Sequence, residues 1–168
     1  MYFILYITLY FSTEIPECAI GHSACDNVHS CNAPTARIAS IGYPHNYFIR
    51  SRCAWKINTP LGTFITLTTL DFDVPSWESC DSTYVSIYNG LSDRNDLLGS
   101  YCNNIMPPTT LTSGFNEMFI RFQSGQEAPG TGFLFQYESQ VFMTSNSTSV
   151  ISGMYLFIPV KFRDNLYQ

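Results

Sequence analysis

The residues best suited to chemistry gather near the start of the chain, where three cysteines and two histidines stand close together: Cys18, His22, Cys25, His29 and Cys31. Cysteine and histidine are the usual zinc ligands, and zinc modules present them as C-x2-4-C and H-x3-5-H pairs. Here six and five residues separate successive cysteines. An oxidising compartment would also join them in disulfides. The pattern therefore favours a small disulfide loop, or the remnant of a preceding cysteine-rich module, over a metal site.

Groups that could catalyse a reaction are few. No serine stands in a Gly-x-Ser-x-Gly motif, and His45, which follows Tyr43-Pro44, is typical of an exposed turn residue. Asp71 and Asp73 occupy alternate positions and could form a carboxylate pair, but the end of a strand that enters an acidic loop explains them better. We therefore predict that the chain is not an enzyme, and we assign it no catalytic residue.

The composition indicates an extracellular domain. With 168 residues, 45% of them apolar, the chain can bury the core of one domain. Charged residues make up 12%, the net charge is -5, and lysine and arginine form no cluster in the sequence. Nucleic acids and anionic membranes attract basic patches, so neither is an expected partner. The six cysteines, an even number, point to disulfides and an oxidising compartment.

Short strands separated by turns account for most of the chain after Cys31. Alternating apolar and polar residues, with many β-branched and aromatic side chains, are typical of half-buried strands. We expect strands at Cys53–Ile57, Thr63–Phe72, Tyr84–Tyr88, Leu97–Cys102, Met118–Phe122 and Phe133–Tyr137. Their inward faces would hold Ile65 and Leu67; Val85 and Ile87; Met118, Ile120 and Phe122; and Phe133, Phe135 and Tyr137. The pattern predicts an all-β fold, an antiparallel β-sandwich.

Ordered motifs in the same stretch resemble those of a CUB domain. They include Ser40-Ile41-Gly42-Tyr43-Pro44-x-x-Tyr47, Cys53-x-Trp55-x-Ile57, Pro60-x-Gly62, Tyr84-Val85-x-Ile87-x-x-Gly90, Leu98-Gly99-x-Tyr101-Cys102 and Gly130-x-Gly132-Phe133. The similarity runs from Cys31 to Glu138 and implies a jelly-roll-like sandwich of the CUB type, stapled by disulfides.

The resemblance also implies a disulfide pattern, because CUB domains pair their first cysteine with their second and their third with their fourth. Carried onto this chain, the pattern joins Cys31 to Cys53 and Cys80 to Cys102. By elimination Cys18 would pair with Cys25, or with another molecule. Sequence arithmetic alone leaves all pairings of the six cysteines open.

Many CUB domains hold calcium through three carboxylates, and the resemblance places Pro75, Thr83 and Gly125 at those positions. Tyr47 matches the family's supporting tyrosine, but one phenol cannot hold a dication. We therefore expect no calcium or other cofactor, and we do not expect the recognition of a partner lysine that the calcium-bearing members show. Three nearby acidic residues could form a displaced site, although a solvated acidic loop is the favoured interpretation: Asp73, Glu78 and Asp81.

The chain divides into four expected parts: a signal peptide at 1–13, a short Cys-containing N-terminal segment at 14–30, the CUB domain at 31–138, and a polar linker with a C-terminal tail at 139–168. The apolar run Tyr2–Phe11 has the length of a signal-peptide core. A wrong gene start and an ordered strand are the alternatives. The chain is thus expected to be secreted.

The C-terminal tail carries the expected modification. Asn146-Ser147-Thr148 is an N-glycosylation acceptor, so we predict a glycan on Asn146. The later apolar run, Val150–Val160, is short and contains a proline, and we therefore expect no membrane span.

The predicted function is that of an extracellular, non-catalytic binding module with a protein or glycan partner. Its expected contact surface comprises a tryptophan in a polar loop and two tyrosines on an outward strand face: Trp77, Tyr84 and Tyr88. One alternative is a non-catalytic CUB fragment of a larger secreted protease, astacin-like or trypsin-like, which a longer transcript with His-Glu-x-x-His would reveal. The other is a small lectin-like secreted protein that resembles the spermadhesins.

Overall fold

The computed structural model describes residues 15–18, 25, 28–77, 79–126 and 129–142. This part of the chain forms nine strands and no helix. The strands are β1 Val28–Cys31, β2 Thr35–Ala39, β3 Arg52–Asn58, β4 Thr63–Asp73, β5 Tyr84–Asn89, β6 Asp96–Tyr101, β7 Thr110–Thr112, β8 Glu117–Gln123 and β9 Gly132–Val141. All six predicted strands are present, and the short strands β1, β2 and β7 are additions to them.

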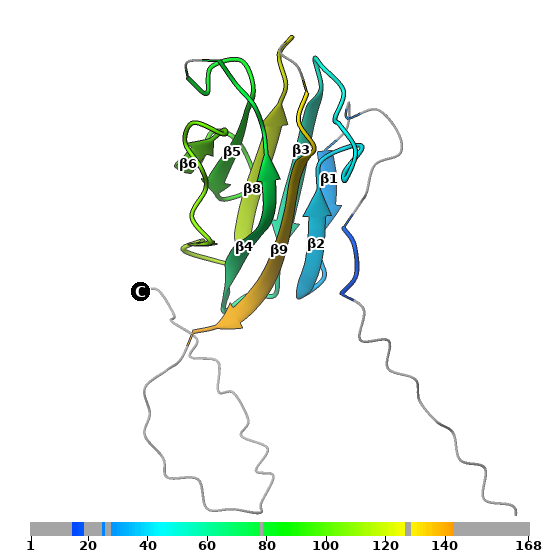
Figure 1. Ribbon diagram of the computed structural model, residues 1–168. Coiled ribbons are helices and arrows are strands. Elements are labelled where there is room, and N and C mark those ends of the chain that lie inside the picture. The colour runs from blue at the N-terminus through cyan, green and yellow to red at the C-terminus, as the bar shows by residue number, and fades with distance from the viewer. Residues whose placement is uncertain (1–14, 19–24, 26–27, 78, 127–128, 143–168) are drawn as a thin grey trace, which may run out of the picture.

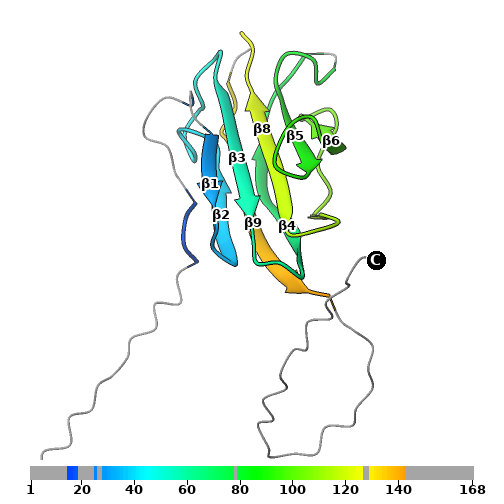
Figure 2. The same cartoon turned by 180° about the vertical axis from the view of Figure 1, so that it is seen from behind.

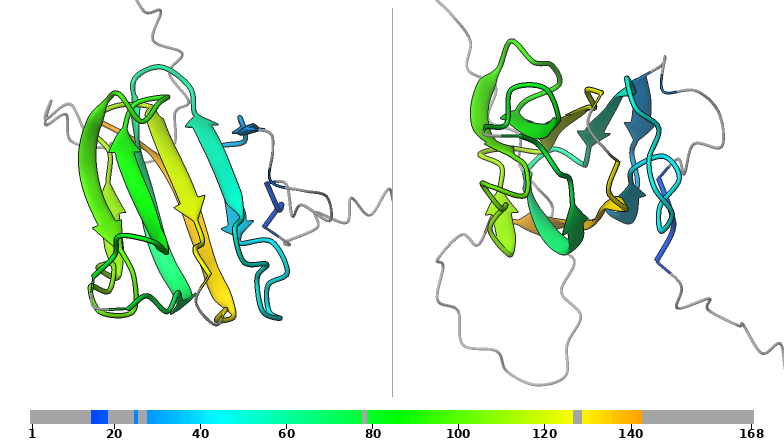
Figure 3. Two further views of the ribbon diagram at one scale, coloured as in Figure 1. Left: turned by 90° about the horizontal axis from the view of Figure 1, so that it is seen from above. Right: turned by 45° about the horizontal axis from the view of Figure 1, so that its top comes forward.

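Two sheets face one another and form the predicted β-sandwich. One sheet has the order β1-β3-β8-β5-β6 and the other the order β2-β9-β4-β7. Figure 1 shows the smaller sheet in front, Figure 2 shows the larger one, and Figure 3 shows the two layers from other directions. Every strand pair is antiparallel except β1 with β3, which is parallel. The all-β prediction is therefore confirmed.

The core lies between the sheets and consists of the side chains that the alternation predicted to point inward. All ten are buried: Ile65, Leu67, Val85, Ile87, Met118, Ile120, Phe122, Phe133, Phe135 and Tyr137. Trp55 of β3 joins them, with its ring edge-on to Phe133 at a centroid distance of 5.6 Å. Complete burial of one such side chain stabilises the fold by about 2 kcal/mol. Burial also raises the pKa of Tyr137 to about 12.

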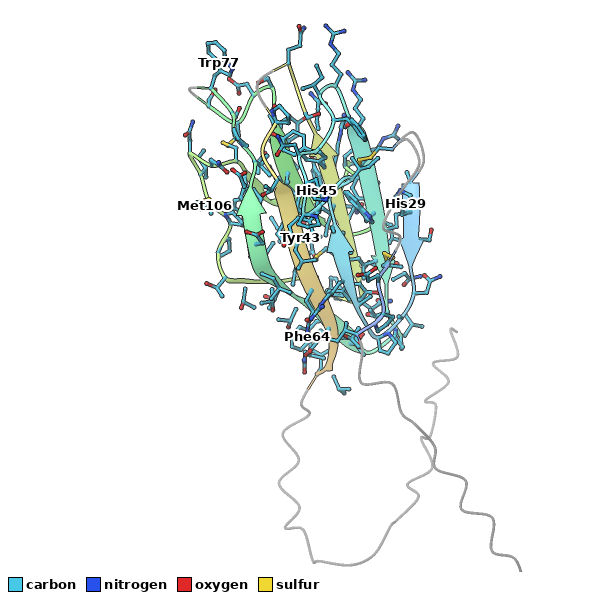
Figure 4. The ribbon with its side chains drawn as sticks, turned by 45° about the vertical axis from the view of Figure 1, so that its right-hand side comes forward. His29, Tyr43, His45, Phe64, Trp77 and Met106 are labelled. Atoms are coloured by element: carbon cyan, nitrogen blue, oxygen red, sulfur yellow. A yellow bond between two sulfur atoms is a disulfide. The ribbon has the colours of Figure 1, made fainter. Side chains whose placement is uncertain are left out.

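The strand register gives the sandwich two distinct ends. At one end Arg52, Gln123 and Tyr84 lie opposite one another on β3, β8 and β5. We call this the groove end. At the other end Asn58 lies opposite Glu117, and Pro60 to Gly62 form the turn from β3 to β4. We call this the turn end; Figure 4 shows Trp77 at the groove end and Phe64 at the turn end.

Three disulfides join the six cysteines, and they correct two of the three expected pairings. Cys18 is bonded to Cys31, Cys25 to Cys53, and Cys80 to Cys102. The Cys80–Cys102 bond is the one that the resemblance implies. The pairings Cys31 with Cys53 and Cys18 with Cys25 are wrong.

The register of β1 explains the correction. Cys31 lies opposite Ile57, four residues along β3 from Cys53. At about 3.3 Å per residue this separates the two positions by roughly 13 Å, whereas a disulfide requires Cα atoms within about 7 Å. Cys25 precedes Val28, which lies opposite Ala54, and its Cα is 4.5 Å from that of Cys53.

The N-terminal segment takes part in the fold. Arg37 of β2 donates its backbone N–H to the carbonyl of Pro16 and accepts the N–H of Cys18, so that the segment extends the edge of β2. Ordered structure thus includes residues before the expected domain start at 31, and β9 runs three residues past the expected end at 138.

Several expectations concern residues outside those described. They are the signal peptide at 1–13, the glycan on Asn146 and the run Val150–Val160. The described residues contain no helix long and apolar enough to cross a membrane.

Candidate functional site

Backbone and side-chain hydrogen bonds extend the β3–β8 pairing beyond the strands at the groove end. The N–H of Ser51 donates to Ser124 Oγ at 2.8 Å, and the N–H of Ser124 donates to the carbonyl of Ser51 at 3.0 Å. The N–H of Arg50 donates to the carbonyl of Gly125 at 2.9 Å. The segments 50–52 and 123–125 are therefore fixed side by side.

The residue before β5 is hydrogen-bonded to the segment 123–125 from the side opposite β3. The N–H of Gly125 donates to Thr83 Oγ1 at 2.9 Å, and Thr83 is only 1% exposed. Ser124 Oγ donates to the carbonyl of Phe48 at 2.8 Å. Ser124 and Gly125 thus form a fixed floor between the β3 and β5 sides.

A concave surface lies over this floor. One hollow of about 520 Å³ is lined by Arg50, Arg52, Ser82, Gln123, Ser124, Gly125 and Gln126. A second hollow, of about 380 Å³, is lined by Trp77, Ser82, Gly125 and Gln126. The two hollows adjoin, because Ser82, Gly125 and Gln126 line both, and we call them together the groove. Both hollows are open to solvent, so the groove is a shallow surface rather than an enclosed cavity.

Trp77 stands at the side of the groove with 76% of its surface exposed, and its side chain projects from the end of the molecule in Figure 4. Its loop is nevertheless held in place. Asn104 Nδ2 donates to the carbonyls of Trp77 and Ser76, and the Cys80–Cys102 disulfide anchors the loop three residues further on. A large apolar side chain on a fixed, exposed loop is typical of a contact residue.

Of the two tyrosines expected to accompany Trp77, one lies close to the groove. Tyr84 donates its hydroxyl to Gln123 Oε1 at 3.4 Å, and Gln123 lines the groove. Tyr88 lies four residues along β5 toward the turn end, where its ring packs against Phe119 at 6.0 Å. The structure therefore brings Trp77 and Tyr84 to one end of the sandwich and places Tyr88 away from it.

Asp73 fastens two further loops at the groove end. Its carboxylate accepts hydrogen bonds from Asn103 Nδ2 at 2.9 Å, from the N–H of Thr131 at 2.8 Å and from Thr131 Oγ1 at 3.3 Å. The Asn103 bond and then the Thr131 bonds hold the pKa of Asp73 below its ordinary value, although partial burial opposes them. Asp73 thus acts as a structural anchor.

A family model describing the CUB domain matches residues 25–137. The chain belongs to the CUB domain family. The match begins at Cys25, so that Cys25 and Cys53 are the first and second cysteines of this CUB domain and Cys31 is an additional one.

Sequence and structure comparisons with known proteins support the assignment to the CUB family. Cubilin of Rattus norvegicus is 34% identical over 113 residues, which cover 67% of this chain and 3% of cubilin. Neuropilin-1 of Xenopus laevis is 37% identical over 133 residues, covering 78% and 14%. The full extracellular region of zebrafish Gpr126/Adgrg6 superposes with a TM-score of 0.60 at 26% identity, covering 71% and 15%. The chain spans between 3% and 14% of the length of these curated relatives.

The three residues that the resemblance places at the family's calcium positions carry no carboxylate, and calcium needs several carboxylate oxygens. Thr83 and Gly125, at two of the three positions, are joined directly by a neutral hydrogen bond. Pro75, at the third, lies against Gly130, where an added Cβ would approach Pro75 Cδ to 2.5 Å. The described residues contain no group of three or more metal-ligating side chains.

The remaining chemical candidates have structural contacts in this CUB domain. Asp71 Oδ2 accepts the hydroxyl of Tyr43 at 3.0 Å, while Asp71 Oδ1 accepts the N–H of Phe72. Burial, and then the bond to Asp71, raises the pKa of Tyr43. His29 packs against Trp55 at 6.1 Å, and His22 lies outside the described residues. The cysteines of the apparent zinc cluster are all consumed by disulfides.

Sequence reasoning missed Arg50 and Arg52 as site residues. The two arginines stand two positions apart, which is too few charges to register as a basic cluster. Their place in the groove depends on Ser82 and Gln126, which come from segments distant in sequence. The Arg-x-Arg spacing at the start of the Trp55 strand was the available signal.

Proposed function

We propose that this CUB domain is an extracellular, non-catalytic binding module that binds a protein through its groove end. CUB domains are in general extracellular binding modules without catalytic activity, and the relatives of this chain carry such domains. The observation that carries the proposal is the exposure of Trp77 beside the groove on a disulfide-anchored loop.

The fixed geometry of the groove end favours binding. Interface hot spots are enriched in tryptophan, tyrosine and arginine, and all three are present here. Because Asn104 binds the backbone carbonyl of Trp77 and the Cys80–Cys102 disulfide lies three residues further on, the loop backbone should lose little conformational entropy when a partner covers it.

The proposed binding does not depend on calcium. The hydrogen bond from Gly125 to Thr83 and the Asp73 contacts join the loops that an ion would otherwise hold. Binding of a partner should therefore be unchanged by EDTA.

The test uses the full chain, secreted from a eukaryotic host and screened against a panel of recombinant extracellular proteins with and without EDTA. For any protein bound, Trp77→Ala is expected to raise Kd about tenfold or more. Phe115→Ala is the matched control, because Phe115 is a 69% exposed aromatic residue next to β8 at the turn end. Equal affinity of the wild type and Trp77→Ala, or loss of binding in EDTA, would overturn the proposal.

A glycan is the second candidate partner, favoured by the amide side chains of Gln123 and Gln126 beside Trp77. Amide groups both donate and accept hydrogen bonds, as sugar hydroxyls require. Binding on a glycan array that Trp77→Ala and Tyr84→Phe both remove, without any protein bound, would decide for this function.

A further inference from the structure

The groove carries two arginines whose guanidinium groups have no hydrogen-bond or ion-pair partner among the described residues. Arg50 and Arg52 both line it. The ion pair found in the described part of the chain joins Arg121 to Asp93 at 3.0 Å and involves neither of them. A guanidinium offers five donors in a planar fork that matches a carboxylate. Two guanidinium groups without a partner therefore line the same concave surface.

The surroundings of these charges are neutral in the described part of the groove. The other lining residues there are serine, glutamine, glycine and tryptophan. Arg52 shares another hollow with Asp93, but that carboxylate is already bound to Arg121. The described part of the groove is therefore positively charged, although the whole chain has a net charge of -5.

The backbone holds Arg50 in an uncommon conformation. Its φ is +59°, in the left-handed region that glycine or asparagine adopts at lower cost. The bond from the N–H of Arg50 to the carbonyl of Gly125 fixes this conformation. A strained residue with a long cationic side chain at the edge of a groove suggests that the side chain is used.

The two arginines and Trp77 belong to one surface. Ser82, Gly125 and Gln126 line both hollows and connect the cationic side of the groove to the aromatic side. Arg52 and Tyr84 also flank Gln123 in one cross-strand row. A ligand that meets the arginines can therefore extend toward Trp77 over neutral polar groups.

We propose that the groove recognises an Asp or Glu carboxylate of a protein ligand, with Arg50 and Arg52 binding the carboxylate and Trp77 packing against a neighbouring apolar side chain. This inference rests on the proposed function and specifies the chemistry of the partner. Arginine–carboxylate pairs are charge-assisted and often bidentate, which gives geometric specificity as well as affinity. The combination of arginine and tryptophan is that of a protein interface hot spot.

The experiment selects ligands without a named partner. The full 168-residue chain is used to select from a phage library of random twelve-residue peptides, and the enriched peptides are synthesised with a fluorescent label. We expect the peptides to share an Asp or Glu near an apolar residue. Replacing that residue by Asn or Gln should raise Kd about tenfold, as expected for loss of a charged pair.

Charge-matched variants locate the site. Arg50→Gln/Arg52→Gln should also raise Kd about tenfold, since both side chains are exposed and the backbone bond of Arg50 does not depend on its side chain. Arg37→Gln/Arg94→Gln removes the same charge from other parts of the molecule and should change Kd less than about threefold. Equal thermal stability of the two double variants confirms that the groove arginines are not needed for folding.

Each other outcome has a defined meaning. Peptides without a required carboxylate, or equal affinity for Arg50→Gln/Arg52→Gln, overturn this inference while leaving protein binding intact. Failure to enrich any peptide, together with failure of the protein panel, overturns the proposed function as well. A heparin fragment or sialyllactose that binds only when Arg50 and Arg52 are present, with no peptide selected, shows that the groove reads an acidic glycan and overturns the protein ligand.

Discussion

At the groove end, segments far apart in sequence are joined by disulfides and a carboxylate, whereas the turn end is closed by a short turn and by neutral hydrogen bonds. Residues 48–52, 76–77, 79–83, 103–104, 124–126 and 129–131 assemble the groove end, with two disulfides and the carboxylate of Asp73 among them. At the turn end, Thr63 Oγ1 bonds to Thr59 Oγ1 at 2.9 Å and donates to the carbonyl of Pro60 at 2.8 Å. Asn116 Nδ2 donates to the carbonyl of Thr59 at 2.8 Å and ties the start of β8 to this turn. A short turn pays little loop entropy, but a surface made of distant segments needs cross-links.

Both ends expose apolar side chains, yet only one combines them with a charged groove in the described structure. Leu61 at the turn end is 90% exposed, and Phe115 is 69% exposed. Isolated exposed apolar residues are ordinary at turns. At the groove end, Trp77 lines a hollow that adjoins the one lined by Arg50 and Arg52. Cross-links that hold such a surface are therefore expected to matter for binding as well as for stability.

The largest effect is expected from the groove-end disulfide. Cys80→Ser/Cys102→Ser opens a loop with a sequence separation of 22 and should lower the free energy of unfolding by about 3 kcal/mol. Guanidinium titration measures the loss. Cys18→Ser/Cys31→Ser, which opens a separation of 13, should cost a similar amount but leave peptide binding to the folded domain intact. Equal loss of binding in both variants would contradict the assignment of binding to the groove end.

A smaller loss is expected from Ser124→Ala. This change removes the acceptor of the Ser51 N–H in a residue that is 5% exposed, which should lower the free energy of unfolding by about 2 kcal/mol. Thr63→Val, its counterpart at the turn end, should cost about 1 kcal/mol, since the turn keeps its short connection. Thermal unfolding followed by circular dichroism compares them. A greater loss for Thr63→Val would reverse the proposed difference between the ends.

Asp73 should contribute to the pH dependence of the free energy of unfolding. Because the folded-state pKa of Asp73 is lowered, its stabilising effect is present above the unfolded value of about 4 and is lost as pH falls toward the folded value. The free energy of unfolding of the wild type should therefore fall more steeply below pH of about 4 than that of Asp73→Asn. Denaturant titrations across this range provide the measurement. Parallel curves would show that the Asn103 and Thr131 bonds do not favour the ionised carboxylate.

The smallest stability effects are expected at the exposed apolar residues. Trp77→Ser and Leu61→Ser should each change the free energy of unfolding by less than about 0.5 kcal/mol, because both side chains are exposed. Their effects on binding should differ, with loss for Trp77→Ser and no change for Leu61→Ser. Isothermal titration with a selected peptide distinguishes them. A binding defect in Leu61→Ser would extend the contact surface to the turn end.

Local patterns predicted the strands that carry the core. In 84–88, 118–122 and 133–137 the alternation of apolar and polar residues identified the buried face of each strand, because the apolar residues pack against the opposite sheet. The strands that were missed are short: β7 has three residues and β1 four, and period-2 alternation is hardly measurable over such lengths. β2 has five residues, which is also too short for a clear alternation.

The pairing of Cys31 was mispredicted because register is a tertiary property. The motif order made Cys31 appear to be the first family cysteine, and the sequence could not show that β1 runs parallel to β3 with Cys31 opposite Ile57. For the same reason the groove arginines were missed: nothing local to 50–52 indicates that Ser82 and Gln126 lie nearby.

The pairing of residues 16–18 with Arg37 has a consequence for solubility. A bare edge strand offers its N–H and C=O groups to strands of other molecules and promotes aggregation. The N-terminal segment occupies part of that edge of β2, and the Cys18–Cys31 disulfide prevents it from peeling away. Reduction of the Cys18–Cys31 disulfide would therefore expose an aggregation-prone sheet edge before the core itself unfolds.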